Sequence, residues 1–131
     1  MNIAGPATTM DRLYRFQRHI YDPTRKYYLL GRDRLIEGLA PPPGGAVLEI
    51  GCGTARNLLW AARLYPEAVC YGIDVSREML VTASRRVERS GLARRVELAW
   101  ADATTFDPGA TFGRSDFSRI FFSYSLSMIP D

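Results

Sequence analysis

Apolar and polar positions alternate in blocks along the second two thirds of the chain. Short apolar runs predict strands over residues 46–50, 68–73, 95–100 and 117–123. Apolar residues at helical spacing predict helices over residues 54–65 and 76–90, and residues 104–113 predict a loop with about one turn of helix. Apolar strands that alternate with helices are typical of a parallel, doubly wound α/β sheet, here of about four strands.

The first 43 residues follow a different pattern, in which two helices precede a proline-rich connector. One helix is predicted from about residue 9 to residue 21, where Asp22-Pro23 interrupts the pattern. A second is predicted from about residue 23 to residue 39, before the rigid Pro-Pro-Pro-Gly-Gly connector. We therefore expect a helical arm over residues 1–43 and an α/β body over residues 44–131.

Composition narrows the class of protein. A length of 131 residues suits one domain, and a hydrophobic content of 47% is ordinary for a packed globular chain. No apolar run is long enough to span a membrane and the N-terminus has no apolar signal core, so we expect a cytoplasmic protein. The chain has one histidine, and its two cysteines are not at the spacing of metal ligands. We therefore expect no metal site.

The net charge of +3 comes from the N-terminal segment, where seven basic residues face four acidic ones over residues 1–40. The same segment is rich in tyrosine and phenylalanine. Two roles of this arm remain open, namely packing against the body and peripheral contact with a lipid surface. RNA binding is disfavoured, because the basic residues are spread over two predicted helices and diluted by acids.

Three acids follow or end successive predicted strands, namely Glu49, Asp74 and Asp102, which are 25 and 28 residues apart. Each separation is about one strand and one helix. Ligands of open α/β sheets bind outside the carboxyl ends of the strands, so the three side chains are expected to face one crevice.

A glycine turn, Gly51-Cys52-Gly53, follows the first of these strands, and such turns let the backbone approach a ligand closely. A dinucleotide fits poorly here. The third-glycine position of the dinucleotide pattern holds Arg56, and Glu49 would repel a pyrophosphate.

S-adenosyl-L-methionine fits better, because it carries a sulfonium and an ammonium group and no phosphate. Glu49 supplies negative potential near the amino-acid end of this cofactor, under which the Gly51–Gly53 backbone passes. Asp74 is suited to accept hydrogen bonds from the two ribose hydroxyls. Each acid also has a structural alternative, for example a salt bridge from Glu49 to Arg56 or a turn and helix cap at Asp74.

The adenine of the same cofactor is matched by four residues. The Asp102 carboxylate suits its amino group, and the Ala103 backbone N–H suits a ring nitrogen. Val75 and Met79 are placed to enclose the faces of the ring. Asp102 is the weakest of these assignments, since aspartate is common directly after strands.

Three segments then resemble the first three motifs of class I S-adenosylmethionine-dependent methyltransferases, namely residues 48–57, 72–76 and 101–103. The resemblance implies a Rossmann-like fold and adds Cys52, Asn57 and Ser123 to the cofactor residues. It departs at Ala55, where the family usually has a third glycine. The family normally has seven strands, so we expect the chain to be truncated after the fourth, with Ser123 and Tyr124 beside the transferred methyl.

A narrower resemblance covers residues 14–33, which are similar to the N-terminal segment of the methyltransferases of betaine-lipid synthesis. Those enzymes trimethylate the amine of diacylglyceryl-homoserine. The resemblance implies N-methylation of a lipid head group, with Tyr21, Tyr28 and Tyr124 as candidates for a lid over cofactor and substrate. A quinone precursor, another small acceptor, and an inactive cofactor-binding half-domain remain as alternatives.

Overall fold

The computed structural model describes residues 26–29 and 34–122, with the backbone alone for residues 26–29, 34 and 35. Its elements, in chain order, are β1 (Lys26–Leu29), α2 (Arg34–Glu37), β2 (Ala46–Ile50), α3 (Arg56–Leu64), β3 (Val69–Asp74), α4 (Arg77–Ser90), β4 (Val96–Trp100), α5 (Pro108–Phe112) and β5 (Arg119–Phe122). The strands form one sheet in the order β1-β5-β2-β3-β4, and every pairing is parallel. The predicted α/β Rossmann-like fold is therefore confirmed.

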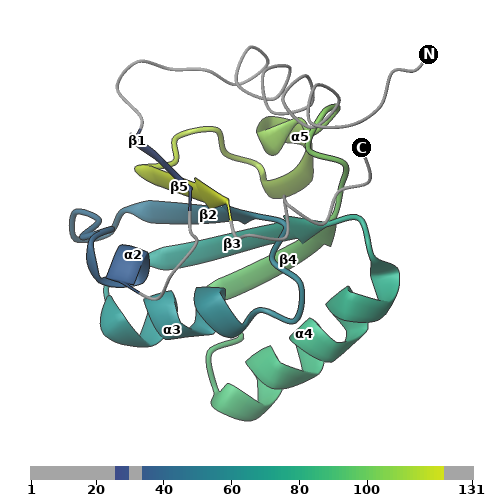
Figure 1. Cartoon of the computed structure of the whole chain (residues 1–131), viewed down its shortest axis with the longest axis horizontal. Helices are drawn as coiled ribbons and strands as arrows, with labels where there is room; N and C mark the ends of the chain where they lie inside the picture. Colours follow the sequence, from purple (N-terminus) through teal and green to yellow (C-terminus); the bar gives the residue numbers. More distant parts are fainter. Residues whose placement is uncertain (1–25, 30–33, 123–131) are drawn as a thin grey trace.

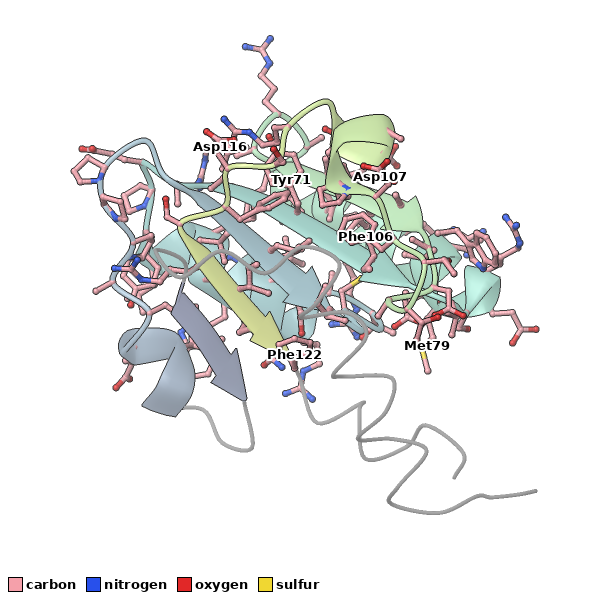
Figure 2. All side chains as sticks on the ribbon, turned by 90° about the horizontal axis from the view of Figure 1, so that it is seen from above. Tyr71, Met79, Phe106, Asp107, Asp116 and Phe122 are labelled. Atoms are coloured by element: carbon pink, nitrogen blue, oxygen red, sulfur yellow. The ribbon has the colours of Figure 1, made fainter. Side chains whose placement is uncertain are left out.

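Helices cover both faces of the sheet, with α3 and α4 on one side and the short α5 on the other (Figure 1). Successive residues of a strand point to opposite faces, so β2 contributes Val47 to the core under α3 and α4 and contributes Leu48 to the core under α5. Figure 2 shows Tyr71 and Phe106 on the α5 face, where they belong to the second core. Two cores on two faces make the sheet doubly wound, as predicted.

The predicted second helix of the arm is wrong over residues 26–29. These residues form β1, which pairs with β5 in parallel register, and helix is confined to α2 within the described part of this segment. The sheet thus has five strands where four were expected. The last predicted strand, observed as β5, is an inner strand, because it lies between β1 and β2.

The segment before the proline connector is bound to the body by hydrogen bonds to backbone carbonyls. The Arg119 guanidinium donates to the Leu39 carbonyl at 2.6 Å and to the Ala40 carbonyl at 2.9 Å. The Tyr65 hydroxyl lies 2.7 Å from the carbonyl of Ile36. Ile36 and Leu39 are fully buried in the core under α3. These contacts join α2 to the α/β body.

In the described part of the chain, no helix has the length and apolarity that crossing a lipid bilayer requires.

Candidate functional site

The carboxyl ends of β2, β3 and β4 meet at one edge of the sheet, because these strands are parallel neighbours. Register places Asp74 of β3 opposite Trp100 of β4, two residues before Asp102. Glu49 lies one residue before the end of β2, opposite Gly72. The three predicted acids are therefore carried by adjacent strand ends, as the sequence spacing indicates.

The turn after β2 folds back across the end of β3. The backbone N–H groups of Gly51 and Cys52 both donate to the Ile73 carbonyl at 2.9 Å. Gly51 has φ 78° and Gly53 has φ 55°, in the left-handed region that favours glycine. The turn presents its backbone at the edge of the sheet where the three acids lie.

Ala55 precedes α3 with φ 71°, which explains why a third glycine is typical of this position. The left-handed conformation costs an L-residue with a side chain about 1–2 kcal/mol. Ala55 is completely buried, so its methyl group also contributes to the core under α3. Alanine is thus tolerated here with local strain.

Gly72 in β3 is a close-packed position that the sequence reasoning did not single out. A Cβ at this position would lie 2.9 Å from the Cys52 Cβ and 2.9 Å from a Leu58 methyl carbon. The missing side chain is what lets the turn after β2 pass close to β3. An isolated glycine within an apolar strand is the signal that indicates such a close approach.

Asp74 connects the two loops that flank it. Its Oδ2 accepts the Gly53 backbone N–H at 2.8 Å, and its Oδ1 accepts the Ser76 backbone N–H at 2.8 Å. The Ser76 hydroxyl in turn accepts the Met79 N–H and caps α4. The cap role and the ligand role of Asp74 are compatible, since a carboxylate has about four acceptor positions.

Asp102 is partly buried and organises its own turn. Its Oδ1 accepts both the backbone N–H and the hydroxyl of Thr104, each at 2.8 Å. Ala103 lies in the same turn and is also partly buried. The structural alternative for Asp102, a turn residue after a strand, is therefore realised, and one of its carboxylate oxygens is engaged by Thr104.

Exposed apolar side chains gather beside Asp74. Val75 is 58% exposed, Met79 is 42% exposed and Trp100 is 47% exposed. Figure 2 shows Met79 pointing outward at this end of the sheet. Apolar surface next to hydrogen-bonding carboxylates suits a flat, polar-edged ring.

Glu49 is completely buried on the sheet face that α3 covers. Its charge acts on the turn above it. Burial raises the pKa of the Cys52 thiol, and the carboxylates of Glu49 and Asp74 raise it further. The negative potential of two of the three acids therefore converges on the glycine turn.

Both cysteines are free and buried, and we expect them to react slowly in the folded chain. Burial raises the pKa of the Cys70 thiol from 9.0 to about 12, with Arg95 opposing the shift and Glu49 adding to it. Three units of pKa leave roughly a thousandfold less thiolate at pH 8. Ellman's reagent should therefore modify the thiols at pH 8 far faster in urea than in native buffer.

The same shift predicts a loss of stability in alkali. A raised pKa favours the neutral thiol in the folded state, so the stabilisation by Cys70 is complete below about pH 9 and is lost as the pH rises toward 12. Urea unfolding at successive pH values measures this. Rapid labelling of both thiols in native buffer would contradict the burial on which both expectations depend.

The remaining predicted residues are placed as follows. Asn57 lies in the first turn of α3 and is partly buried. Tyr28 lies in β1, where the backbone alone is described. Tyr21, Ser123 and Tyr124 lie outside the described residues. The lid assigned to the tyrosines stays a prediction.

A separate hollow of about 340 Å³ lies between α3 and α4. Its lining is basic and comprises Arg56, Leu59, Arg63, Arg86, Arg89 and Ser90. None of the predicted cofactor residues that the structure describes lines this hollow. Within the described part of the chain, no group of three or more histidine, cysteine or acidic side chains is arranged to hold a metal ion.

The fold and the row of acids beside a glycine turn define a Rossmann-like domain whose ligand lies at the carboxyl ends of its strands. Residues 47–131 match a family described as a methyltransferase domain. The chain belongs to this family of methyltransferase domains.

Individual relatives agree with the family. The methyltransferase GfsG of Streptomyces halstedii is 34% identical over 99 residues, which cover 76% of this chain and 34% of that protein. The phosphatidylethanolamine N-methyltransferase of Cereibacter sphaeroides is 37% identical over 89 residues, which cover 67% of this chain and 40% of that protein. The chain thus spans less than half the length of these curated relatives.

A solved structure agrees as well. PKMT2 from Rickettsia typhi in complex with S-adenosylhomocysteine (AdoHcy) superimposes with a TM-score of 0.53 and 30% sequence identity. The match covers 65% of this chain and 16% of that protein.

Proposed function

We propose that this chain is the cofactor-binding part of an S-adenosyl-L-methionine-dependent methyltransferase. The observation that carries the proposal is the row of carboxylates at adjacent strand ends, with Asp74 fastened to the glycine turn through the Gly53 N–H. Membership of the methyltransferase-domain family and the S-adenosylhomocysteine bound to PKMT2 support the same cofactor.

The residues of this edge fit that cofactor. Its sulfonium and ammonium groups are cationic, and the charges of Glu49 and Asp74 converge on the turn beside them. Asp74 retains acceptor positions for the ribose hydroxyls. The exposed apolar surface of Val75 and Met79 suits the adenine ring. Asp102 and Ala103 are proposed to hydrogen-bond its edge.

When bound, S-adenosyl-L-methionine supplies an electrophilic methyl group for in-line displacement. The contribution of this chain is to bind the donor, to orient it by its two ends, and to exclude water from the methyl group. Neither buried cysteine acts as a nucleophile in this proposal, because their raised pKa values keep both thiols neutral.

For the methyl acceptor we propose a lipid head-group amine of the diacylglyceryl-homoserine type. The resemblance of residues 14–33 to the betaine-lipid methyltransferases and the relationship to a phosphatidylethanolamine N-methyltransferase support it. An amine product that becomes quaternary suits contact with tyrosine faces. This acceptor implies a cytoplasmic protein that contacts the inner membrane surface through its basic, aromatic arm.

The acceptor is tested by transfer of a labelled methyl group. The chain is incubated with methyl-tritiated S-adenosyl-L-methionine and with vesicles that contain either diacylglyceryl-homoserine or phosphatidylethanolamine, and label is counted in the extracted lipid. Soluble amines and quinone precursors are offered in parallel. We expect label in the lipid fraction, with the Asp74→Ala variant as background.

Label in a soluble amine or a quinone precursor alone would reject the lipid acceptor and leave the methyltransferase activity standing. Cofactor binding without transfer to any acceptor would instead identify a binding half-domain.

A further inference from the structure

Trp100 is exposed yet held in place by two contacts. Its indole Nε1–H donates to the Val75 carbonyl at 2.8 Å. The guanidinium of Arg77 lies over its ring, 4.4 Å from the ring centroid. Both contacts reach residues 75–77, which directly follow Asp74 and include the first residue of α4. These two contacts fix the position of the exposed Trp100 side chain.

A second bond joins the same two segments. The Ala101 backbone N–H donates to the Asp74 carbonyl at 3.1 Å, in continuation of the register that pairs Asp74 with Trp100. The segments after β3 and β4 are thereby fastened side by side by one backbone bond and one side-chain bond. These are the segments that carry the residues proposed to bind adenosine.

The apolar surface of the described residues is concentrated at this corner. Five large hydrophobic side chains of the described residues are exposed. Three of them, Val75, Met79 and Trp100, lie at this corner. The other two, Leu64 and Val81, lie within α3 and α4. Exposed apolar area beside the backbone of Asp74 is where an aromatic ring would be buried on binding.

We propose that Trp100 is a positioning residue for the adenosine part of the cofactor. By holding the Val75 carbonyl it keeps the Asp74–Arg77 segment in one arrangement before the ligand arrives. The entropy of ordering that segment is then lost on folding and not on binding, which raises the affinity. This inference rests on the cofactor site proposed above.

A purely structural Trp100 would behave differently. Its removal would lower the free energy of unfolding by freeing the end of β4, and the folded fraction would bind the cofactor normally. A positioning Trp100 changes the dissociation constant of the folded protein. Binding and stability therefore have to be measured on the same variants.

The sharpest variant is Trp100→Phe, which removes the indole N–H and retains a ring under Arg77. We expect the dissociation constant of S-adenosylhomocysteine, measured by calorimetry, to rise roughly threefold to tenfold, the range of one lost hydrogen bond. Trp100→Ala should raise it further. Val81→Ala removes exposed apolar area from the same helix as Met79 and should bind like the unchanged chain.

Fluorescence gives an independent readout, since Trp60 in α3 is the other tryptophan of the chain. In a Trp60→Phe background, Trp100 is the sole indole, and saturation with S-adenosylhomocysteine should shift or quench its emission. In the Trp100→Phe chain, Trp60 should report no change. Unaltered emission from Trp100 would reject its place beside the ligand.

The outcomes separate this inference from the cofactor site itself. If Asp74→Ala weakens binding and Trp100→Phe does not, Trp100 has no positioning role and the site stands. If Trp100→Phe lowers the unfolding midpoint alone, the role is structural and the inference is overturned. If neither variant alters binding, or if the unchanged chain binds no S-adenosylhomocysteine, the site and the inference fall together.

Discussion

Replacement of Asp74 by alanine is expected to raise the dissociation constant of S-adenosyl-L-methionine by about tenfold or more. The variant removes the acceptor for two ribose hydroxyls, and hydrogen bonds to a charged group contribute about 1.5–3 kcal/mol each. It also releases the Gly53 and Ser76 backbone N–H groups that the carboxylate holds at 2.8 Å. Isothermal titration calorimetry on the purified chain measures the effect.

A matched control is available in α5. Asp107 also accepts two backbone N–H groups, from Gly109 and Ala110, but it caps α5 and is not among the proposed cofactor residues. Asp107→Ala should lower stability by about 1 kcal/mol and leave cofactor affinity unchanged. The cofactor affinity of Asp74→Asn should lie between that of Asp74→Ala and that of the unchanged chain, because an amide keeps one acceptor oxygen. Equal affinity of Asp74→Ala and the unchanged chain would sink the ribose assignment.

Gly72→Ala is expected to affect both stability and binding. The new methyl group would meet two atoms of neighbouring side chains at 2.9 Å, one on Cys52 and one on Leu58. Overpacking of this kind typically lowers the free energy of unfolding by about 1–3 kcal/mol. The adjustment also displaces the turn that Cys52 belongs to, so cofactor affinity should fall together with stability. Urea unfolding and calorimetry measure the two effects.

The control for this variant is Gly109→Ala in α5. A Cβ there would find its nearest neighbour, the Asp107 Oδ1, at an ordinary 3.5 Å. Alanine in a helix is favoured over glycine by about 0.5–1 kcal/mol, so this variant should be neutral or slightly more stable. If Gly72→Ala were as well tolerated as Gly109→Ala, the close passage of the turn over β3 would not constrain the site.

The central elements could be predicted because their signals are local. Residues 46–50 form a short apolar run and the observed β2 has the same bounds. The helix predicted over residues 76–90 is observed as α4, with Ser76 as its N-cap and Gly91 as its C-cap. The apolar run over residues 68–73 likewise placed Asp74 at the end of β3, where its carboxylate is observed to accept the Gly53 N–H. Local pattern and tertiary contact agree here.

The parts that could not be predicted depend on contacts across the sheet. Residues 26–29 are compatible with a helix by local pattern, and their strand conformation is fixed by pairing with β5, far along the chain. The hydrogen bond from the Trp100 indole to the Val75 carbonyl likewise depends on how the ends of β3 and β4 lie against each other. Periodicity carries no information on such pairings.

Pairing of β1 with β5 has a consequence for the order in which the chain assembles during synthesis. Lys26 leaves the ribosome 93 residues ahead of its partner Arg119. At about 5–20 residues per second, the N-terminal strand waits roughly 5–20 s without a neighbour. The contiguous β2–β4 unit can close in that interval, so β1 is the last of the five described strands to dock, and a chaperone or nascent-chain protease would meet it as an unprotected segment.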